Sequence, residues 1–392
     1  MTLKRRPDVR FLSELYALEG TADVLLAEYP SSNSDETRLQ NRTKYIIHDP
    51  FPPPRPELMK VLGPHHLMCG WGNYVNVCSE VPPPTGLTDH WKRAFGEDAV
   101  PSWQTFDPTD SGSSAQPAVR YHTLFPHQSI PAEQQVVHPD INYAIHSKEV
   151  IQKIDCAQAE VLDRVAMPCL VKLSHGYAGL GNFFIREESD ELEMRRLLDR
   201  HWPDATLVIN SIIENICGDY GVQFFLNSEG VATYLGVTQQ HFDQNMKWCG
   251  GSFSASIQDQ LCDAAAPIIE ATGQYLHDQG YIGLVGIDVL QDSAGRYFLV
   301  DVNPRLTGIS PFLMNSRILA LQGLKEGVYR ASVRTKGTMQ RLISIAERAE
   351  NGRLVILSVF EEPDGTGCVS HMSANAESLD RCNELLDEIA RL

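Results

Sequence analysis

The sequence of 392 residues contains no apolar stretch that approaches the roughly 20 residues a membrane-spanning helix requires. Its basic first residues, MTLKRRPDVR, are not followed by an apolar run as long as that of a signal peptide. The nine cysteines form no C-x-x-C pair, and an odd, scattered set is typical of reduced thiols. We therefore expect a cytoplasmic protein with no membrane partner.

Positive charge is also scarce. Lys and Arg number 33 against 50 Asp and Glu, which gives a formal net charge of −17 at pH 7. Because proteins bind nucleic acid through clustered Lys and Arg, we expect no nucleic-acid partner. The 43% hydrophobic and 21% charged content is that of an ordinary folded protein, long enough for two or three domains.

Three motifs that carry chemistry in many enzymes are missing as well. The sequence has no G-K-[ST] to complete a Walker phosphate loop, and no glycine fingerprint that opens a helix as in dinucleotide-binding folds. It has no G-x-S-x-G motif and no recognisable Cys–His pairing. We therefore do not expect a mechanism that depends on a protein nucleophile.

The most informative stretch that is present runs from Gly283 to Gly308. Residues 286–290 and 297–300 are apolar and typical of strands, and the polar residues 292–295 between them are typical of a tight turn. The stretch therefore predicts an antiparallel hairpin.

Oxygen-bearing side chains fall at matching places in this predicted hairpin. Asp288 interrupts the first strand, and Asp301 and Asn303 close the second. Two carboxylates and an amide oxygen suit Mg²⁺, which commonly combines one or two carboxylates with substrate phosphates. Arg305 follows with a planar cation suited to phosphate or carboxylate. A hairpin whose acids are merely solvated is the alternative, although Asp is disfavoured inside an apolar strand.

An earlier segment predicts a loop that contacts phosphate. Residues 168–173 read as a strand that carries Lys172, and the glycine-rich segment Ser174–Asn182 leads into a second strand at 183–185. Glycines allow the backbone to approach an anion closely. A simple turn is the alternative, but an ammonium group within an apolar strand favours an anionic partner.

Together these segments resemble the ATP-grasp superfamily. Residues 286–289 (GIDV) and 301–308 (DVNPRLTG) match the family's magnesium- and ATP-binding hairpin, with Asp301 where Glu is commoner. The resemblance covers roughly residues 145–310. It implies that Asp288, Asp301 and Asn303 bind Mg²⁺ and that Arg305 is the catalytic residue, which stabilises the transferred phosphoryl group.

The resemblance further implies that the nucleotide is ATP. The backbone of Glu214 to Ile216 would read adenine, and Asp219 would reach the ribose. Asp219 follows Gly218 at a slightly tighter spacing than usual, so a solvent-facing turn acid is the alternative. The ATP-binding residues predicted in this way are Lys148, Lys172, Gly176, Tyr177, Ala178, Gly179, Glu214, Asn215, Ile216 and Asp219.

The predicted fold class is α/β and α+β, with an ATP-grasp fold whose two lobes clamp ATP. The predicted domains are a substrate-side α/β domain (1–145), a lid subdomain (146–213), a main lobe with the metal site (214–330) and a small C-terminal hairpin and helix (331–392). The first domain rests on the resemblance, because proline-rich breaks separate its short apolar runs and no βαβ rhythm is evident. Outside the motifs we predict strands near 23–27, 74–78 and 354–360 and helices over 189–200, 259–279, 318–327 and 376–392.

Two histidine-containing places are less readily interpreted. His65, His66 and Cys69 are close enough in sequence for a metal site, but no complementary pair accompanies them, so a packing or surface role is favoured. His371 lies in the predicted C-terminal hairpin, and we assign it no chemistry.

The resemblance implies an ATP-dependent carboxylate–amine ligase that forms an acyl phosphate and releases ADP and phosphate. The substrates would be a small-molecule carboxylate and an amine, with amino acids as the expected class. A kinase on the same fold and a non-catalytic ATP-binding module are the alternatives. The sequence names neither substrate, and it is compatible with a homo-oligomer.

Overall fold

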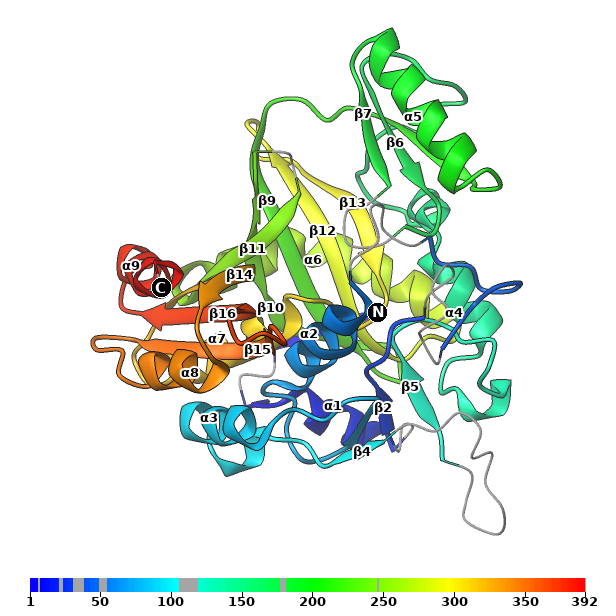
Figure 1. The fold of residues 1–392 in the computed structure, drawn as a ribbon. Coiled ribbons are helices and arrows are strands. Elements are labelled where there is room, and N and C mark those ends of the chain that lie inside the picture. The colour runs from blue at the N-terminus through cyan, green and yellow to red at the C-terminus, as the bar shows by residue number, and fades with distance from the viewer. Residues whose placement is uncertain are drawn as a thin grey trace.

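The computed structural model describes residues 1–5, 8–20, 24–30, 39–48, 55–105, 119–176, 181–244 and 247–391. Figure 1 shows a large central sheet, a small sheet with one helix above it, an N-terminal part below, and C-terminal strands and helices to one side. Among the described residues, no helix is long and apolar enough to cross a membrane.

The central sheet organises the described part of the chain. Its strands run in the order β13-β12-β9-β10-β11-β14-β16-β15, and β1 (Thr2–Arg5) pairs in parallel with β10. Helix α6 (Gln258–Asp278) packs on β9, β10 and β13. The other strands are β9 (Ile216–Leu226), β10 (Val231–Phe242), β11 (Trp248–Ser254), β12 (Gly283–Asp292), β13 (Tyr297–Asn303), β14 (Glu326–Lys336), β15 (Arg353–Glu361) and β16 (Gly367–Ala376).

One glycine in this sheet is required by close packing. Gly250 of β11 has φ +154°, and a Cβ atom built on it would collide with the carbonyl oxygen of Tyr329 on β14.

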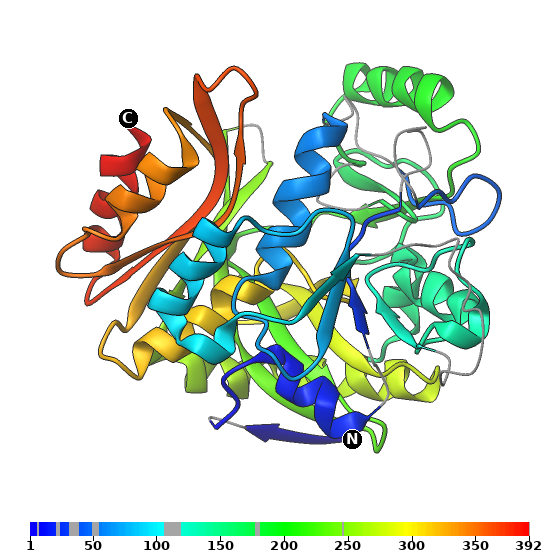
Figure 2. The same cartoon turned by 60° about the horizontal axis from the view of Figure 1, so that its bottom comes forward.

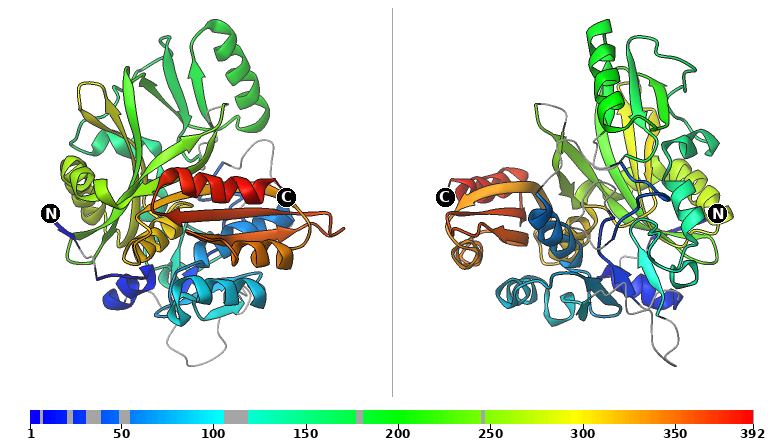
Figure 3. Two further views of the ribbon diagram at one scale, coloured as in Figure 1. Left: turned by 90° about the vertical axis from the view of Figure 1, so that its left-hand side faces the viewer. Right: turned by 45° about the vertical axis from the view of Figure 1, so that its right-hand side comes forward.

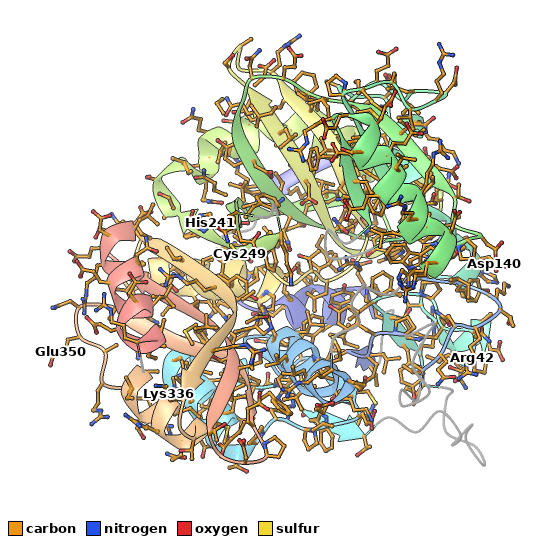
Figure 4. All side chains as sticks on the ribbon, turned by 45° about the horizontal axis from the view of Figure 1, so that its top comes forward. Arg42, Asp140, His241, Cys249, Lys336 and Glu350 are labelled. Carbon is orange, nitrogen blue, oxygen red and sulfur yellow. The ribbon has the colours of Figure 1, made fainter. Side chains whose placement is uncertain are left out.

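The outer ends of β10 and β11 carry His241 and Cys249, which lie side by side and far from Asp140 in Figure 4. This end of the β10–β11 pair therefore lies far from the part of the surface that carries Asp140.

A second sheet of three antiparallel strands lies above the central one. Its order is β7-β6-β8, and its helix α5 (Glu188–His201) packs on β7. The apolar side chains Val171 and Ile185 are buried inside it, together with Met194 of the helix. The strands are β6 (Cys169–Leu173), β7 (Asn182–Ile185) and β8 (Leu207–Ser211).

The N-terminal part contains a parallel sheet that the sequence did not make evident. Three-residue and four-residue strands pair in the order β4-β3-β2-β5. Strands β2 and β3 confirm the strands predicted near 23–27 and 74–78. The elements are α1 (Leu12–Glu19), β2 (Val24–Leu26), α2 (Pro56–Met68), β3 (Asn76–Ser79), α3 (Thr85–Phe95), η1 (Glu97–Ala99), β4 (Trp103–Thr105), β5 (Tyr121–Thr123), η2 (Ala132–Gln134), α4 (Pro139–His146) and η3 (Lys148–Lys153).

The C-terminal strands lie between helices from opposite ends of the sequence. Helices α8 (Met339–Ala346) and α9 (Leu379–Ala390) cover one face of β14–β16, and α2 and α3 lie on the other face (Figures 2 and 3). Trp91 of α3 is fully buried there, and its indole nitrogen donates to the carbonyl oxygen of Ile356 at 2.9 Å. The C-terminal segment therefore extends the central sheet.

Most helices match the predicted ranges within a few residues, with one exception. The helix predicted over 318–327 is wrong, because α7 covers Ser310–Ala320 and β14 begins at Glu326. Gly323 has φ +94°, a left-handed conformation that ends the helical path. Pro311 in the first turn of α7 fits the earlier start, since proline is favoured there.

Candidate active site

The predicted hairpin is present and brings its two acids together. Asp288 of β12 is the register partner of Asp301 on β13, and Gly286 is the partner of Asn303. The residues 293–296 form the turn between the strands. Side chains of register partners project from the same face of a sheet, so the two carboxylates are neighbours.

Two lysines lie close to Asp301. Lys148 Nζ lies 2.5 and 2.6 Å from the two carboxylate oxygens of Asp301. Lys172 of β6 is 7% exposed, and its Nζ donates to the carbonyl oxygen of Val300 at 2.8 Å. Ser147 caps the 3₁₀ helix η3 that carries Lys148, because its Oγ accepts from the amide of Glu149 at 3.2 Å.

The two acids have opposite electrostatic surroundings. Burial alone would raise the pKa of Asp301, but the cations of Lys148 and Lys172 outweigh it and lower that pKa. Burial and the neighbouring carboxylates of Asp301 and Asp219 raise the pKa of Asp288 to about 7. Gln240 of β10 donates to Asp288 Oδ1 at 2.8 Å.

Asp219 lies on the same face of the sheet as these acids. It pairs with Leu290, two residues beyond Asp288 on β12, and alternate residues of a strand share a face. Burial raises its pKa to about 6. Asp219 therefore lies beside the two hairpin acids, and its contact with a ribose stays a prediction.

Arg305 sits directly beyond the hairpin and is 8% exposed. Its Nη2 donates to Asn303 Oδ1 at 3.1 Å and its Nη1 to the carbonyl oxygen of Leu306 at 3.2 Å. The guanidinium carbon lies 4.8 Å from the centre of the Phe125 ring. The buried Nε has no hydrogen-bond partner among the described residues, so this cation has donor capacity left for an anion.

The chemistry of these side chains fits Mg²⁺. Among the described residues there is no group of three or more His, Cys, Asp or Glu placed to hold a metal. Asp288, Asp301 and Asn303 instead offer two carboxylates and one amide oxygen, which matches an ion that takes its remaining ligands from water and substrate phosphates. The ammonium of Lys148 lies against Asp301, where it supplies a positive charge.

The glycine-rich loop is only partly described. Gly176 forms a parallel bridge with His48, and His48 N donates to the carbonyl oxygen of His175 at 3.0 Å. The predicted ATP contacts Tyr177, Ala178 and Gly179 lie outside the described residues. Gly181 has φ +92°, and a Cβ atom there would meet the side chain of Leu173. The loop therefore leaves and rejoins the sheet at two fixed points.

The predicted adenine-binding segment links the two sheets. Glu214 and Asn215 lie between β8 and β9, Ile216 is the first residue of β9, and all three are exposed. Asn215 has φ +54°, and its carbonyl oxygen accepts from the amide of Ser293 in the hairpin turn at 2.8 Å. The segment is thus tied to the same hairpin as the acids, and its role toward adenine stays a prediction.

Several residues of the site gave no readable signal in the sequence. Gln240 lies outside the predicted motifs, yet it donates to Asp288 Oδ1. Gln223 of β9 donates to Thr307 Oγ1 at 2.7 Å and accepts from Ser310 Oγ at 2.5 Å, which fixes the segment after Arg305. Such contacts join strands far apart in sequence, so spacing alone does not reveal them.

A small cavity lies beside Arg305, where three parts of the chain meet. Its volume is about 10 Å³. The lining residues come from the N-terminal part, the lid and the hairpin: Ile47, Phe125, His146, Lys148, His175, Gly176, Val302, Asn303 and Arg305. The sequence did not single out Phe125 or His146, because they are separate residues in segments without a motif. His175 lies in the predicted glycine-rich segment Ser174–Asn182, but no role was predicted for it.

The His65, His66 and Cys69 group supports the packing interpretation. All three are buried on or just after α2. His66 Nδ1 and His371 Nδ1 both hydrogen-bond the hydroxyl of Tyr329, at 3.2 and 2.6 Å, and the three rings pack together. His371 therefore joins a buried ring cluster between α2 and the C-terminal strands.

Comparison with known families identifies the matched segment. Residues 147–303 match the model described as ATP-grasp L-aspartate–L-methionine ligase. The [butirosin acyl-carrier protein]–L-glutamate ligase of Niallia circulans is 22% identical over 212 residues, which are 48% of this chain and 49% of that protein. This chain thus spans about half the length of that curated relative.

Solved structures give the fold. N5-carboxyaminoimidazole synthetase from Staphylococcus aureus covers 100% of both chains with a TM-score of 0.54 at 13% identity. Its complex with ADP aligns with a TM-score of 0.52 at 14% identity over 80% of this chain and 96% of that one. The fold, the hairpin motif and the matched segment agree with the predicted resemblance: residues 147–303 are similar to an ATP-grasp ligase model, and the solved structures share the fold.

Proposed function

We propose that this protein is an ATP-dependent carboxylate–amine ligase that forms an amide bond and releases ADP and phosphate. The observation that carries the proposal is the convergence of Lys148, Lys172 and Arg305 on the end of β13, where they contact Asp301, the carbonyl oxygen of Val300 and Asn303. Cations and acids in this arrangement suit the terminal phosphates of ATP, since phosphoryl transfer mainly requires positioning and charge neutralisation.

Different residues of the chain would bind the phosphates, the adenine and the metal ion. Lys148 and Lys172 would meet the phosphates, and the Glu214–Ile216 segment would hold adenine. Asp288, Asp301 and Asn303 would hold Mg²⁺, which when bound neutralises phosphate charge. A solved structure of the same fold is a complex with ADP, which supports a nucleotide as the ligand.

The reaction we propose has two steps. The substrate carboxylate attacks the γ-phosphorus of ATP, the bond to ADP breaks, and an acyl phosphate forms. A neutral amine then attacks the acyl carbon, a C–N bond forms, and the C–O bond to phosphate breaks, with the amine proton leaving on the phosphate. Arg305 would stabilise the transferred phosphoryl group and the anionic intermediate.

The relatives support amino acids as the substrate class. The matched model names L-aspartate and L-methionine, and the curated relative names L-glutamate. We place the protein in the cytoplasm, because its nine cysteines are all free thiols.

The test is product analysis with ATP, Mg²⁺ and a panel of amino acids as acid and amine. We expect ADP and phosphate, a new amide mass, and full turnover only when acid and amine are both present. With the acid alone, hydroxylamine should trap the acyl phosphate as a hydroxamate. AMP with pyrophosphate would reject attack at the γ-phosphate, and a stable phosphorylated product formed without amine would indicate a kinase. ATP binding without turnover would indicate a non-catalytic module.

A further inference from the structure

The cavity beside Arg305 contains a nitrogen atom that lacks a partner. His146 is the last residue of α4 and is 7% exposed. Its Nδ1 lies 2.7 Å from the carbonyl oxygen of Asn142, while its Nε2 is buried with no hydrogen-bond partner among the described residues. A buried polar atom without a partner is costly, so a ligand that satisfies it would be favoured.

The hydrogen bond to Asn142 fixes which nitrogen carries the proton. A carbonyl oxygen only accepts, so Nδ1 must be the donor. The ring is neutral, because burial and the nearby Arg305 cation lower the pKa of His146 to about 3. Nε2 then has a lone pair and acts only as an acceptor. It needs a ligand that brings an N–H or O–H group.

The rest of the cavity selects between such ligands. Its volume of about 10 Å³ corresponds to about one water-sized group. Lys148 and Arg305 line it with positive charge, which repels an ammonium ion and favours a neutral amine with its lone pair available. Ile47, Phe125 and Val302 supply apolar walls. A single nitrogen, neutral and able to donate, fits these features.

The cavity also lies next to the expected acyl group. Arg305 and Asn303 line it and belong to the hairpin segment that would hold the transferred phosphoryl group. The walls are held together before any ligand arrives, because His48 N donates to the carbonyl oxygen of His175, and Lys148 N to that of Ser174 at 2.8 Å. A nitrogen in this preformed space would lie beside the acyl carbon.

We propose that this cavity receives the nitrogen of the amine substrate and that His146 Nε2 accepts a hydrogen bond from it. The inference rests on the proposed ligase function. His146 would then contact the amine substrate and select it, whereas Arg305 would contact the acid and the phosphate. It also commits the site to primary amines or ammonia, since a bulkier nitrogen would not fit the space.

The test uses hydroxylamine as the amine probe. With the acid that supports hydroxamate formation by the wild-type protein, His146→Leu should raise the KM for hydroxylamine roughly fivefold to tenfold, the size of one lost hydrogen bond. The KM values for ATP and for the acid should stay within about twofold. His146→Gln, which keeps an acceptor, should recover part of the affinity.

A matched control distinguishes the loss of the contact with the amine from general destabilisation of the buried core. His127 is also buried in the N-terminal part, its pKa is also lowered to about 3, and it does not line the cavity. His127→Leu should leave the KM for hydroxylamine unchanged, and thermal unfolding should show that each variant is folded. An unchanged KM in His146→Leu, or an equal rise in His127→Leu, would overturn the assignment.

A second readout does not depend on turnover. In ¹⁵N NMR spectra of histidine-labelled protein, the signal missing from His146→Gln should be that of a ring protonated at Nδ1 and unprotonated at Nε2. A proton on Nε2 would overturn the inference while leaving the proposed function intact. Failure of the wild-type protein to form any hydroxamate would instead overturn the ligase function, and the inference with it.

Discussion

The two halves of the hairpin site differ in charge although they lie on adjacent strands. On the β13 side, Asp301 is held by Lys148 and influenced by Lys172, and Arg305 follows two residues after β13 ends. On the β12 side, Asp288 faces the carboxylates of Asp301 and Asp219 and receives one hydrogen bond from Gln240. We call these the cationic half and the acidic half of the site.

This difference shows how one sheet end can serve two ligands of opposite charge. The cationic half already neutralises its own acid, so it has positive charge to offer to phosphate groups. The acidic half has negative charge without a cation of its own, so it favours a divalent ion. Because Asp288 and Asp301 are register partners, the two halves lie side by side, so one triphosphate would be able to contact both.

The largest effect we expect comes from removing the acid of either half. Asp288→Asn and Asp301→Asn should each lower Mg²⁺-dependent ATP turnover by about 10³-fold, since a bound metal contributes several kcal/mol to catalysis. Both variants should remain folded. The measurement is ADP release over a range of Mg²⁺ concentrations, with circular dichroism as the check on folding. Near-wild-type turnover of the double variant at limiting Mg²⁺ would remove the metal assignment.

A smaller loss should follow from changing the cationic half at Arg305. Arg305→Ala should lower kcat by about 10²-fold with little change in the KM for ATP, because this cation meets charge that moves during phosphoryl transfer. Arg305→Lys keeps the charge but loses the planar fork, and it should recover only part of the rate. Steady-state kinetics separate the two parameters. A change confined to the KM for ATP would assign Arg305 to the nucleotide pocket.

The second cation of this half should behave differently. Lys172→Ala should raise the KM for ATP by about tenfold and change kcat by less than about threefold, because Lys172 meets charge that is present before the reaction. Nucleotide binding measured by calorimetry gives an independent value. A larger effect on kcat than on KM would show that Lys172 acts in the transition state, and the contrast with Arg305 would no longer hold.

The hairpin was predictable because its signals are local. A strand, a polar turn and a returning strand follow one another within 283–303, so Asp288 and Asp301 could be paired from sequence. The contact of Lys148 with Asp301 spans 153 residues, and it was not predicted, because the family resemblance implied only that Lys148 contacts ATP. Spacing carries no information about such distant pairs.

The N-terminal part was predicted only in part, for a different physical reason. Strands β4 and β5 have three residues each, too few for a periodic pattern, and they pair in parallel with β3 and β2, which bury Val77 and Leu25. His146 illustrates the consequence. A lone histidine at a helix end has no meaning in sequence until Phe125 and Arg305 are known to surround it.

The smallest effect should distinguish the two halves by their response to pH. The pKa of Asp288 is raised to about 7 in the folded protein, against about 3.9 for a free Asp in the unfolded chain. Between these values the folded state binds a proton that the unfolded state has lost. The free energy of unfolding therefore falls as pH rises from about 4 to about 7.

Asp288→Asn should remove this contribution, because an amide does not titrate. In metal-free buffer with a chelator, the variant and the wild-type protein should have similar stability near pH 4. The variant should become more stable than the wild type at pH 8, where the wild type carries an unneutralised carboxylate beside Asp301. Asp301→Asn is the matched comparison from the cationic half: it leaves buried lysines without their acid and should lower stability at pH 8. Urea unfolding at a series of pH values measures both differences. If the two variants changed stability in the same direction at pH 8, the division of the site into a cationic and an acidic half would be wrong.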